Sequence, residues 1–231
     1  MADNTVIILT ALAVAAAAYL FGSISFSIIF TRIFIKKDIR SFGSGNAGMT
    51  NVFRSVGAVP GVLTLIGDFG KGILCALIGF FVFKYLNQLG FVIDPVYGKF
   101  FGGAFCFLGH IYPVYYGFKG GKGVLTGSGI MLIIDWRTYC IVMSVFFLVF
   151  LLTRIISAAS LAAVGSFPIV LFLMHGFRTE IDPNAVFLIS QRLFEVSCGV
   201  LFVGIIFIKH IPNIKRIIKG EEKQLKLKKK G

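Results

Sequence analysis

Long apolar runs alternate with short polar segments along most of this 231-residue chain. The apolar residues form continuous runs and not one-sided stripes, and a helix that is apolar on all sides is typical of a membrane interior. The pattern therefore predicts helices that lie in lipid. We expect seven such segments, at 6–30, 59–83, 100–116, 124–134, 139–153, 158–174 and 193–208.

The fourth of these segments is shorter than the others. It has about 11 residues before Asp135, whereas about 20 are needed to cross the hydrocarbon core. It either begins earlier, within the preceding glycine-rich loop, or forms a short, broken or re-entrant helix. The whole pattern predicts an all-α polytopic membrane protein with one domain over 1–231, whose last part, 210–231, is a basic tail.

The charged residues indicate how the chain is oriented. Only 14% of the residues are charged, against roughly 25% in a soluble domain, and the net charge is +13. Seventeen of the 23 Lys and Arg residues lie in the loops 32–57 and 118–123, at Arg154 and in the tail from Lys209. Positive residues gather on the cytoplasmic side. We therefore expect the N-terminus outside, the C-terminus inside, and seven crossings, or five with two re-entrant segments.

The basic tail comes directly after an apolar segment. Such a cluster suits anionic lipid headgroups at a membrane surface, so we expect membrane lipids as partners and no nucleic acid. The three histidines are isolated from one another in the sequence, and we expect no metal site. The sequence does not predict an oligomeric state.

The first polar segment, 41–54, is rich in glycine and in hydrogen-bond donors. Three glycines within six residues (Gly43, Gly45 and Gly48) let a backbone turn tightly and approach a ligand closely. The donors around them suit phosphate oxygens better than they suit a buried core. These candidate binding residues are Ser44, Asn46, Thr50, Asn51 and Arg54.

The second polar segment contains Gly120, Gly121, Lys122 and Gly123 before an apolar run. A glycine-rich turn that leads into a helix presents free N–H groups and a positive dipole end, which favour an anion. Lys122 adds a full charge. The segment does not match the P-loop pattern. The plainer interpretation, equally favoured, is a flexible connection whose lysines mark the cytoplasmic side.

Two further polar segments, 154–160 and 210–216, contain Ser157, Ser160, His210 and Asn213. Helix capping alone explains each of them well. Inside the second apolar segment, Asp68 and Lys71 are three residues apart and share a helix face. Charges inside a membrane helix indicate either a functional site or an internal ion pair that packs helices, and the sequence favours neither.

Taken together, these motifs resemble the PlsY family of bacterial acylphosphate:glycerol-3-phosphate acyltransferases over nearly the whole chain. One departure is Met49, where the family usually has alanine. The matching residues are Gly22-Ser23-Ile24, Asp38-Ile39-Arg40, Gly43-Ser44-Gly45-Asn46 to Asn51, Asp68-x-x-Lys71-Gly72, Gly109-His110-x-Tyr112-Pro113, Phe118 to Gly123, and His210-x-x-Asn213-Ile214.

The resemblance implies transfer of a fatty acyl group from acyl phosphate to the sn-1 hydroxyl of glycerol 3-phosphate, without a cofactor. The products are lysophosphatidic acid and inorganic phosphate, in the first acylation of phospholipid synthesis. It implies an active site on the cytoplasmic face of the bacterial cell membrane. The alternative from another class is a transporter of an organic phosphate, but the internal repeat that many transporters show is missing.

The resemblance also implies roles for individual residues. The expected catalytic residues, which should hold glycerol 3-phosphate, are Ser44, Arg54, Lys122, His210 and Asn213. The acyl phosphate group is expected to contact Asn46, Gly120, Gly121 and Gly123. Thr50, Asn51, Ser157 and Ser160 complete the expected binding set. His210 acts either as a general base or only as a binding group. A third interpretation, a non-catalytic lipid-binding scaffold, does not require so many phosphate-suited donors.

Overall fold

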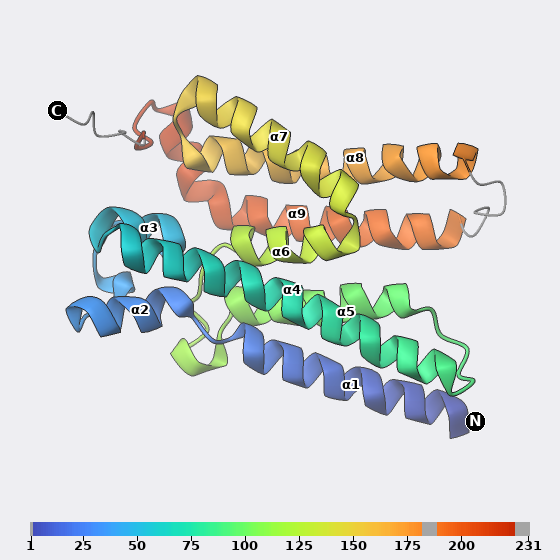
Figure 1. Cartoon of the computed structure of the whole chain (residues 1–231). Coiled ribbons are helices and arrows are strands. Elements are labelled where there is room, and N and C mark those ends of the chain that lie inside the picture. The colour runs from blue at the N-terminus through green and yellow to red at the C-terminus, as the bar shows by residue number, and fades with distance from the viewer. Residues whose placement is uncertain (1, 182–188, 225–231) are drawn as a thin grey trace. The chain divides into compact units, whose positions relative to one another are not determined.

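The computed structural model describes residues 2–181 and 189–224, and every regular element among them is a helix, as predicted (Figure 1). The chain forms two compact units, Met1–Ile134 and Asp135–Gly231. Each unit is described by itself below. The expectation of a single domain over the whole chain stays a prediction.

The first unit is organised around its longest helix, α4, which packs against α1, α2, α3, α5 and α6 (Figure 1). Helix α5 also packs along α1 and α6. The short elements connect the long helices at the end of the unit where the glycine-rich segments lie. In chain order the elements are α1 (Ala2–Gly22), α2 (Phe26–Ile35), η1 (Ile39–Ser41), α3 (Met49–Ser55), α4 (Ala58–Gln88), α5 (Pro95–Ile111), η2 (Val114–Tyr116) and α6 (Val124–Ile134).

The second unit contains α7 (Trp136–Thr153), α8 (Ile156–Ile181) and α9 (Ile189–Ile218), and α8 packs against both of its neighbours. Asp135 caps α7 by accepting a hydrogen bond from the backbone N–H of Arg137. The turn between α7 and α8 is tight because Arg154 takes a left-handed conformation at the end of α7. The hydroxyl of Thr153 accepts a hydrogen bond from the backbone N–H of Ile155, just before α8.

Five stretches of the described residues are long and apolar enough to cross a membrane: 4–35, 58–88, 136–153, 156–174 and 191–218. The first predicted segment is broken by Ser23–Ser25 into α1 and α2, which the continuous apolar run did not indicate. Helix α6 has 11 residues, so the fourth segment is as short as expected. The count of seven crossings and their orientation stay predictions.

Glycines let α4 and α5 approach each other until their backbones touch. A Cβ atom on Gly79 would overlap the carbonyl oxygen of Gly98, and one on Gly98 would overlap the carbonyl oxygen of Gly79. Small residues at such crossings are typical of helices that pack inside membranes, where close van der Waals contact holds helices together. The α4–α5 crossing therefore depends on glycine at both positions.

We expect Gly79→Ala to destabilise the protein, because the added methyl group must push α4 and α5 apart. Overpacking of this kind costs about 1–3 kcal/mol, so Tm in detergent should fall by roughly 3 °C or more. Gly70→Ala is the matched control in the same helix, since nothing lies within 4 Å of a Cβ there. An equal Tm for the two variants would contradict the tight crossing.

Candidate active site

A buried ion pair holds the break between α1 and α2. The ammonium of Lys71 donates hydrogen bonds to the carbonyl oxygens of Gly22 (3.0 Å) and Ile24 (2.7 Å), and lies 3.0 Å from a carboxylate oxygen of Asp68. The same carboxylate oxygen is 3.5 Å from Nδ1 of His110 on α5. Of the two interpretations of Asp68 and Lys71, the structure supports the internal ion pair that packs helices.

The end of α1 is also joined to the turn that comes after α5. The hydroxyl of Tyr19 donates to the carbonyl of Tyr112 (2.7 Å), and the backbone N–H of Val114 donates to the hydroxyl of Ser23 (3.3 Å). The polar residues at the end of the first apolar run therefore make structural contacts between helix ends. They bring the turn before Gly120 close to the broken end of α1.

The glycine-rich loop 42–48 is folded around the side chain of Asn51, which is buried on α3. Its Oδ1 accepts hydrogen bonds from the backbone N–H of Ser44 (3.0 Å) and from the hydroxyl of Ser55 (3.3 Å). Its Nδ2 donates at 3.1–3.3 Å to the loop carbonyls of Phe42 and Asn46 and to that of Ile39 on η1. The amide of Asn51 is thus used to shape the loop, whereas the sequence indicated only a possible ligand.

Gly43 shows why the loop needs glycine. Its φ of +65° lies in the left-handed region, and a Cβ there would overlap the amide oxygen of Asn51. Below the loop, the buried side chains of Ile28, Ile39, Ala47 and Val52 form an apolar cluster that supports it. At the surface of the same unit, the side chains of Ser44 and Arg54 are exposed and those of Asn46 and Thr50 are half-buried.

The second glycine-rich segment lies directly against the first. A Cβ on Gly121 would come within 2.7 Å of the carbonyl oxygen of Ala47 and would also overlap the imidazole of His110. The structure therefore brings the loop 42–48 and the loop 117–123 together within the first unit. Lys122, which is half-buried, belongs to this pair of loops.

The expectation of free N–H groups in the second loop is wrong at two positions. The backbone N–H of Gly120 donates to the carbonyl of Ile111, and that of Gly121 donates to the carbonyl of His110, both at 3.2 Å. These bonds satisfy the last carbonyls of α5, which an α-helix leaves without partners. Both amides are therefore engaged in the fold, and the positive charge of the loop comes from the exposed Lys119 and the half-buried Lys122. Contact of these glycines, and of Gly123, with substrate stays a prediction.

In the second unit, the carboxylate of Glu222 connects two of the predicted binding residues. One oxygen accepts hydrogen bonds from the hydroxyl of Ser157 (2.7 Å) and the amide of Asn213 (2.6 Å), and the other accepts from Nε of Arg216 (2.5 Å). Ser160 is buried on the same helix as Ser157. We call Ser157, Asn213, Arg216 and Glu222 the Glu222 cluster. It joins the start of α8, the end of α9 and the tail.

His210, which is buried on α9, has a defined tautomer in its neutral form. Its Nδ1 lies 2.8 Å from the carbonyl oxygen of Ile206, and a carbonyl can only accept, so Nδ1 carries the proton. Nε2 is then the nitrogen with the lone pair, and it can accept a hydrogen bond or a proton. A general base requires this tautomer, whereas a binding group accepts from a substrate hydroxyl in this tautomer and donates to a phosphate oxygen when both ring nitrogens are protonated.

Sequence reasoning missed Glu222. The tail was interpreted through its nine basic residues, and an acidic residue within a basic run gives no periodic or motif signal. A usable hint was that Glu222 lies only a few residues after Asn213 and Arg216, within reach of the end of α9. In the segment 154–160, the hydroxyl of Ser157 donates to Glu222, a contact that the capping interpretation did not include.

Comparison with known proteins gives a consistent result. The sequence model of the family described as "Glycerol-3-phosphate acyltransferase" matches residues 12–220. A protein of that name from Macrococcus caseolyticus is 37% identical over 213 residues, which are 92% of this chain and 95% of the relative. Another, from Maricaulis maris, is 39% identical over 219 residues, which are 94% of this chain and 88% of the relative.

Two crystal structures are also similar to this chain. Both are of PlsY (YgiH), an integral membrane glycerol 3-phosphate acyltransferase, and each has 31% sequence identity to this chain. The glycerol 3-phosphate form gives a TM-score of 0.77 and covers 94% of this chain and 96% of its own. The lysophosphatidic acid form gives a TM-score of 0.74, with 94% and 95% covered.

We expect Asn51→Asp to disrupt the loop 42–48. Aspartate has the same shape but cannot donate to the carbonyls of Ile39, Phe42 and Asn46, and unsatisfied buried groups cost about 1–3 kcal/mol each. Tm in detergent should fall by roughly 3 °C or more, and proteolysis within 42–48 should become faster. Ser55→Ala, which removes only one bond to Asn51, is the milder control. A variant as stable and as protease-resistant as the wild type would contradict this role of Asn51.

We expect the Glu222 cluster to make stability depend on pH. Burial alone raises the pKa of Glu222, but hydrogen bonds from Arg216, Ser157 and Asn213 outweigh it and lower the pKa below its ordinary value of 4.5. The ionised carboxylate therefore stabilises the fold above about pH 4.5, and this contribution is lost as the pH falls through the lowered pKa.

Glu222→Gln tests this pH dependence in detergent. At pH 7 its Tm should be below that of the wild type, and the difference should shrink as the pH falls below about 4.5. The exposed neighbour provides the control, because Glu221→Gln removes the same charge outside the cluster. A Tm difference that stays constant with pH would contradict the prediction.

Proposed function

This chain belongs to the glycerol-3-phosphate acyltransferase family, and we propose that it transfers a fatty acyl group from acyl phosphate to the sn-1 hydroxyl of glycerol 3-phosphate. The observation that carries the proposal is the family match over residues 12–220, together with the likeness to a solved acyltransferase in its glycerol 3-phosphate form. These named relatives are acyltransferases, so nothing among them favours the transporter.

Acyl phosphate is the donor that best suits the chemistry of the chain. The hydroxyl oxygen of glycerol 3-phosphate attacks the acyl carbonyl carbon and forms an ester bond, while the bond from that carbon to the phosphate oxygen breaks. Inorganic phosphate leaves with the bonding electrons, and the released proton passes to phosphate. Because the leaving group is already good, positioning and charge stabilisation supply most of the rate, and the motifs need no carboxylate base.

In the first unit, Ser44, Arg54 and Lys122 are proposed to hold substrate phosphate. The planar guanidinium of Arg54 suits a contact with two phosphate oxygens, whereas Lys122 acts as a point charge. Asn46 and Thr50 lie between Ser44 and Arg54 in the sequence and are proposed to contact the same substrates. Asn51 is assigned to holding the loop, because its amide groups already have loop partners.

In the second unit, His210 and Asn213 are proposed to contact glycerol 3-phosphate. Nε2 of His210 is the nitrogen that can accept from the substrate hydroxyl, given the bond from Nδ1 to Ile206. Ser157 is favoured over Ser160 as a polar participant, because its hydroxyl shares an acceptor with Asn213. Glu222 holds Ser157 and Asn213 in place.

The location is proposed from charge. Seventeen of the 23 Lys and Arg residues lie in the segments that carry the motifs, which supports a cytoplasmic active face, an external N-terminus and seven crossings. A site at the inner surface of a bacterial cell membrane receives a water-soluble acceptor from one side and a lipid-like donor from the bilayer. Both substrates carry phosphate, which suits the basic loops.

We expect the purified chain to release inorganic phosphate from palmitoyl phosphate only when glycerol 3-phosphate is present. Lys122→Ala should lower kcat/KM by about 10- to 100-fold, since a charge-assisted contact contributes about 1.5–3 kcal/mol. Lys119→Ala, in the same loop with an exposed side chain, is the control and should stay within about twofold of the wild type. The measurement is phosphate release together with lipid product in detergent or vesicles.

Two controls decide the donor and the class of protein. Palmitoyl-CoA should not replace palmitoyl phosphate, and a rate equal to that with palmitoyl phosphate would overturn the proposed donor. A folded sample that forms no acylated glycerol 3-phosphate with either donor would overturn the enzymatic function of this chain. His210→Ala separates the two histidine roles, because a raised KM alone indicates binding and a large loss of kcat at unchanged KM indicates a base.

A further inference from the structure

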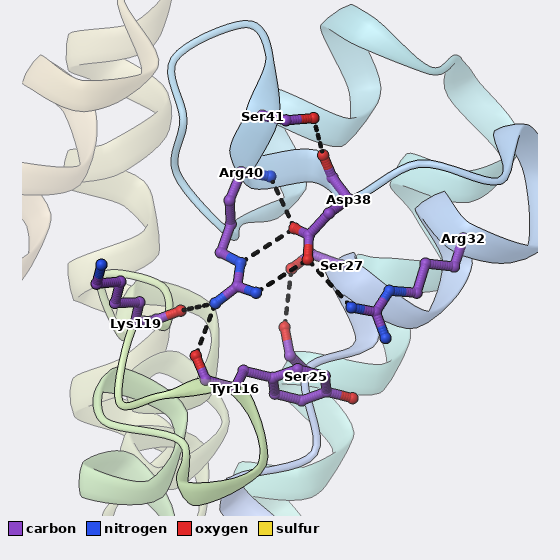
Figure 2. Close-up of polar contacts among 8 residues, drawn as sticks. All are labelled: Ser25, Ser27, Arg32, Asp38, Arg40, Ser41, Tyr116 and Lys119. Carbon is purple, nitrogen blue, oxygen red and sulfur yellow. Dashed lines mark hydrogen bonds and ion pairs between the residues drawn. The ribbon is translucent and has the colours of Figure 1, made fainter.

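Arg40 lies where the two glycine-rich loops meet, and one edge of its guanidinium is fixed by Asp38 (Figure 2). Asp38 caps the short helix η1, since its Oδ1 accepts from the backbone N–H of Arg40 at 3.0 Å. The same carboxylate accepts from Nε (3.0 Å) and Nη2 (2.9 Å) of Arg40. This two-point contact sets the orientation of the guanidinium plane.

The other edge of the guanidinium faces the second loop. Nη1 of Arg40 donates to the carbonyl oxygen of Tyr116 (2.7 Å) and to that of Lys119 (3.3 Å), as Figure 2 shows. These two carbonyls flank Gly117 and Phe118, which both have positive φ, 65° and 59°. Phe118 carries a bulky side chain, for which this backbone conformation is unfavourable, so the surrounding contacts must hold it in place.

The position of these carbonyls matters for the proposed site. Lys119 is directly before Gly120 and Gly121, which pack on the end of α5 and on Ala47, and Lys122 comes next. A shift of the Tyr116–Lys119 turn therefore moves the ammonium of Lys122 relative to the loop 42–48. Arg40 is the side chain that joins the start of one loop to the start of the other.

We propose that Arg40 is a positioning residue that sets the spacing between the loop 42–48 and the loop 117–123, and so places Lys122 for the substrate phosphate. The part of this proposal that concerns substrate phosphate rests on the proposed function, whereas the part that concerns the order of the loop 117–123 does not. Hydrogen bonds from Arg40 lower the pKa of Asp38 below its ordinary value, so the carboxylate stays ionised near neutral pH and the contact persists.

Lysine cannot replace arginine in this role. The guanidinium offers five N–H donors in a rigid plane, and Arg40 uses them on four oxygen atoms that lie on two sides of it. A lysine ammonium is a point charge with three donors on a flexible stem, so it can keep the ion pair with Asp38 but not bridge both sides. Arg40→Lys thus removes the bridge while it retains the charge.

Arg32 provides a matched control. It donates to the same carboxylate of Asp38 (3.2 Å), and its guanidinium lies over the same Tyr116 ring as Arg40, both at 5.9 Å from the ring centre. These contacts of Arg32 are with the carboxylate and the ring, whereas Arg40 donates to the carbonyls of the second loop. Arg32→Lys therefore changes the charge cluster in the same way without changing the loop bridge.

The first measurement is hydrogen–deuterium exchange of the full chain in detergent. In the wild type the amides of Gly120 and Gly121 are hydrogen-bonded to α5 and should exchange slowly. Arg40→Lys should increase exchange in 117–123 by about tenfold or more, because the free energy of local opening falls when the bridge is lost. Arg32→Lys should leave that exchange unchanged. Equal exchange in the two variants would overturn the proposal, whatever the enzyme activity.

The second measurement uses kinetics. Arg40→Lys should lower kcat/KM by about 10- to 100-fold, with Arg32→Lys within about twofold of the wild type. If Arg40 acts through Lys122, then Arg40→Lys should cost much less in a Lys122→Ala background than alone. Additive effects would show that Arg40 acts elsewhere in the fold. If the wild-type protein transfers no acyl group, the proposed function is wrong. The hydrogen–deuterium exchange result then still tests whether Arg40 holds the loop 117–123.

Discussion

A lysine ammonium inside an apolar helix bundle requires a full set of partners, because an unpaired buried charge is very costly. Lys71 finds them in Asp68 and in the carbonyls of Gly22 and Ile24. Those carbonyls belong to the break at which the first apolar run turns from α1 into α2. The ammonium of Lys71 thus replaces helical hydrogen bonds that are missing at the break, and the carbonyls at the break are hydrogen-bond acceptors for the ammonium. Without the hydrogen bonds from Lys71, the carbonyls of Gly22 and Ile24 would lose these partners, which would favour one continuous helix.

The two glycine-rich loops of the first unit depend on that break. Helix α2 carries Ile28 into the apolar cluster beneath the loop 42–48, and it leads to Asp38, which orients Arg40. His110 lies beside Asp68 on one side and against the backbone of Gly121 on the other. The buried ion pair is therefore linked to the second loop through His110 and to the first loop through α2. A membrane protein has little hydrophobic driving force between its helices, so packing and polar contacts of this kind define its fold.

The sequence predicted the features that local patterns encode. Continuous apolar runs identified the helices and the short α6, and clustered glycines identified the two loops, because both signals lie within a few neighbouring residues. The break at Ser23–Ser25 was missed although serines lie at it, because Lys71, which donates to the carbonyls of Gly22 and Ile24, lies far away along the chain. The same reason applies to Glu222, whose partner Ser157 is 65 residues away. Asn51 was expected in a polar loop and lies on the short helix α3, and its role was missed because a side-chain amide in a motif looks the same whether it contacts a ligand or a backbone.

The second loop illustrates how this fold restricts the chemistry. Because the amides of Gly120 and Gly121 are committed to the end of α5, they do not offer an anion the backbone cradle that a P-loop provides. If this loop binds substrate phosphate as proposed, the amides of Gly120 and Gly121 do not contribute, and the proposed contact is the side chain of Lys122, whose ammonium is a point charge without directional preference. A point charge contributes to transition-state stabilisation only if it is held at the right distance. The backbone hydrogen bonds of Gly120 and Gly121 leave these two amides unable to bind an anion, but they also fix the backbone next to Lys122. The proposed reaction proceeds mainly by positioning, so a fixed lysine suits it.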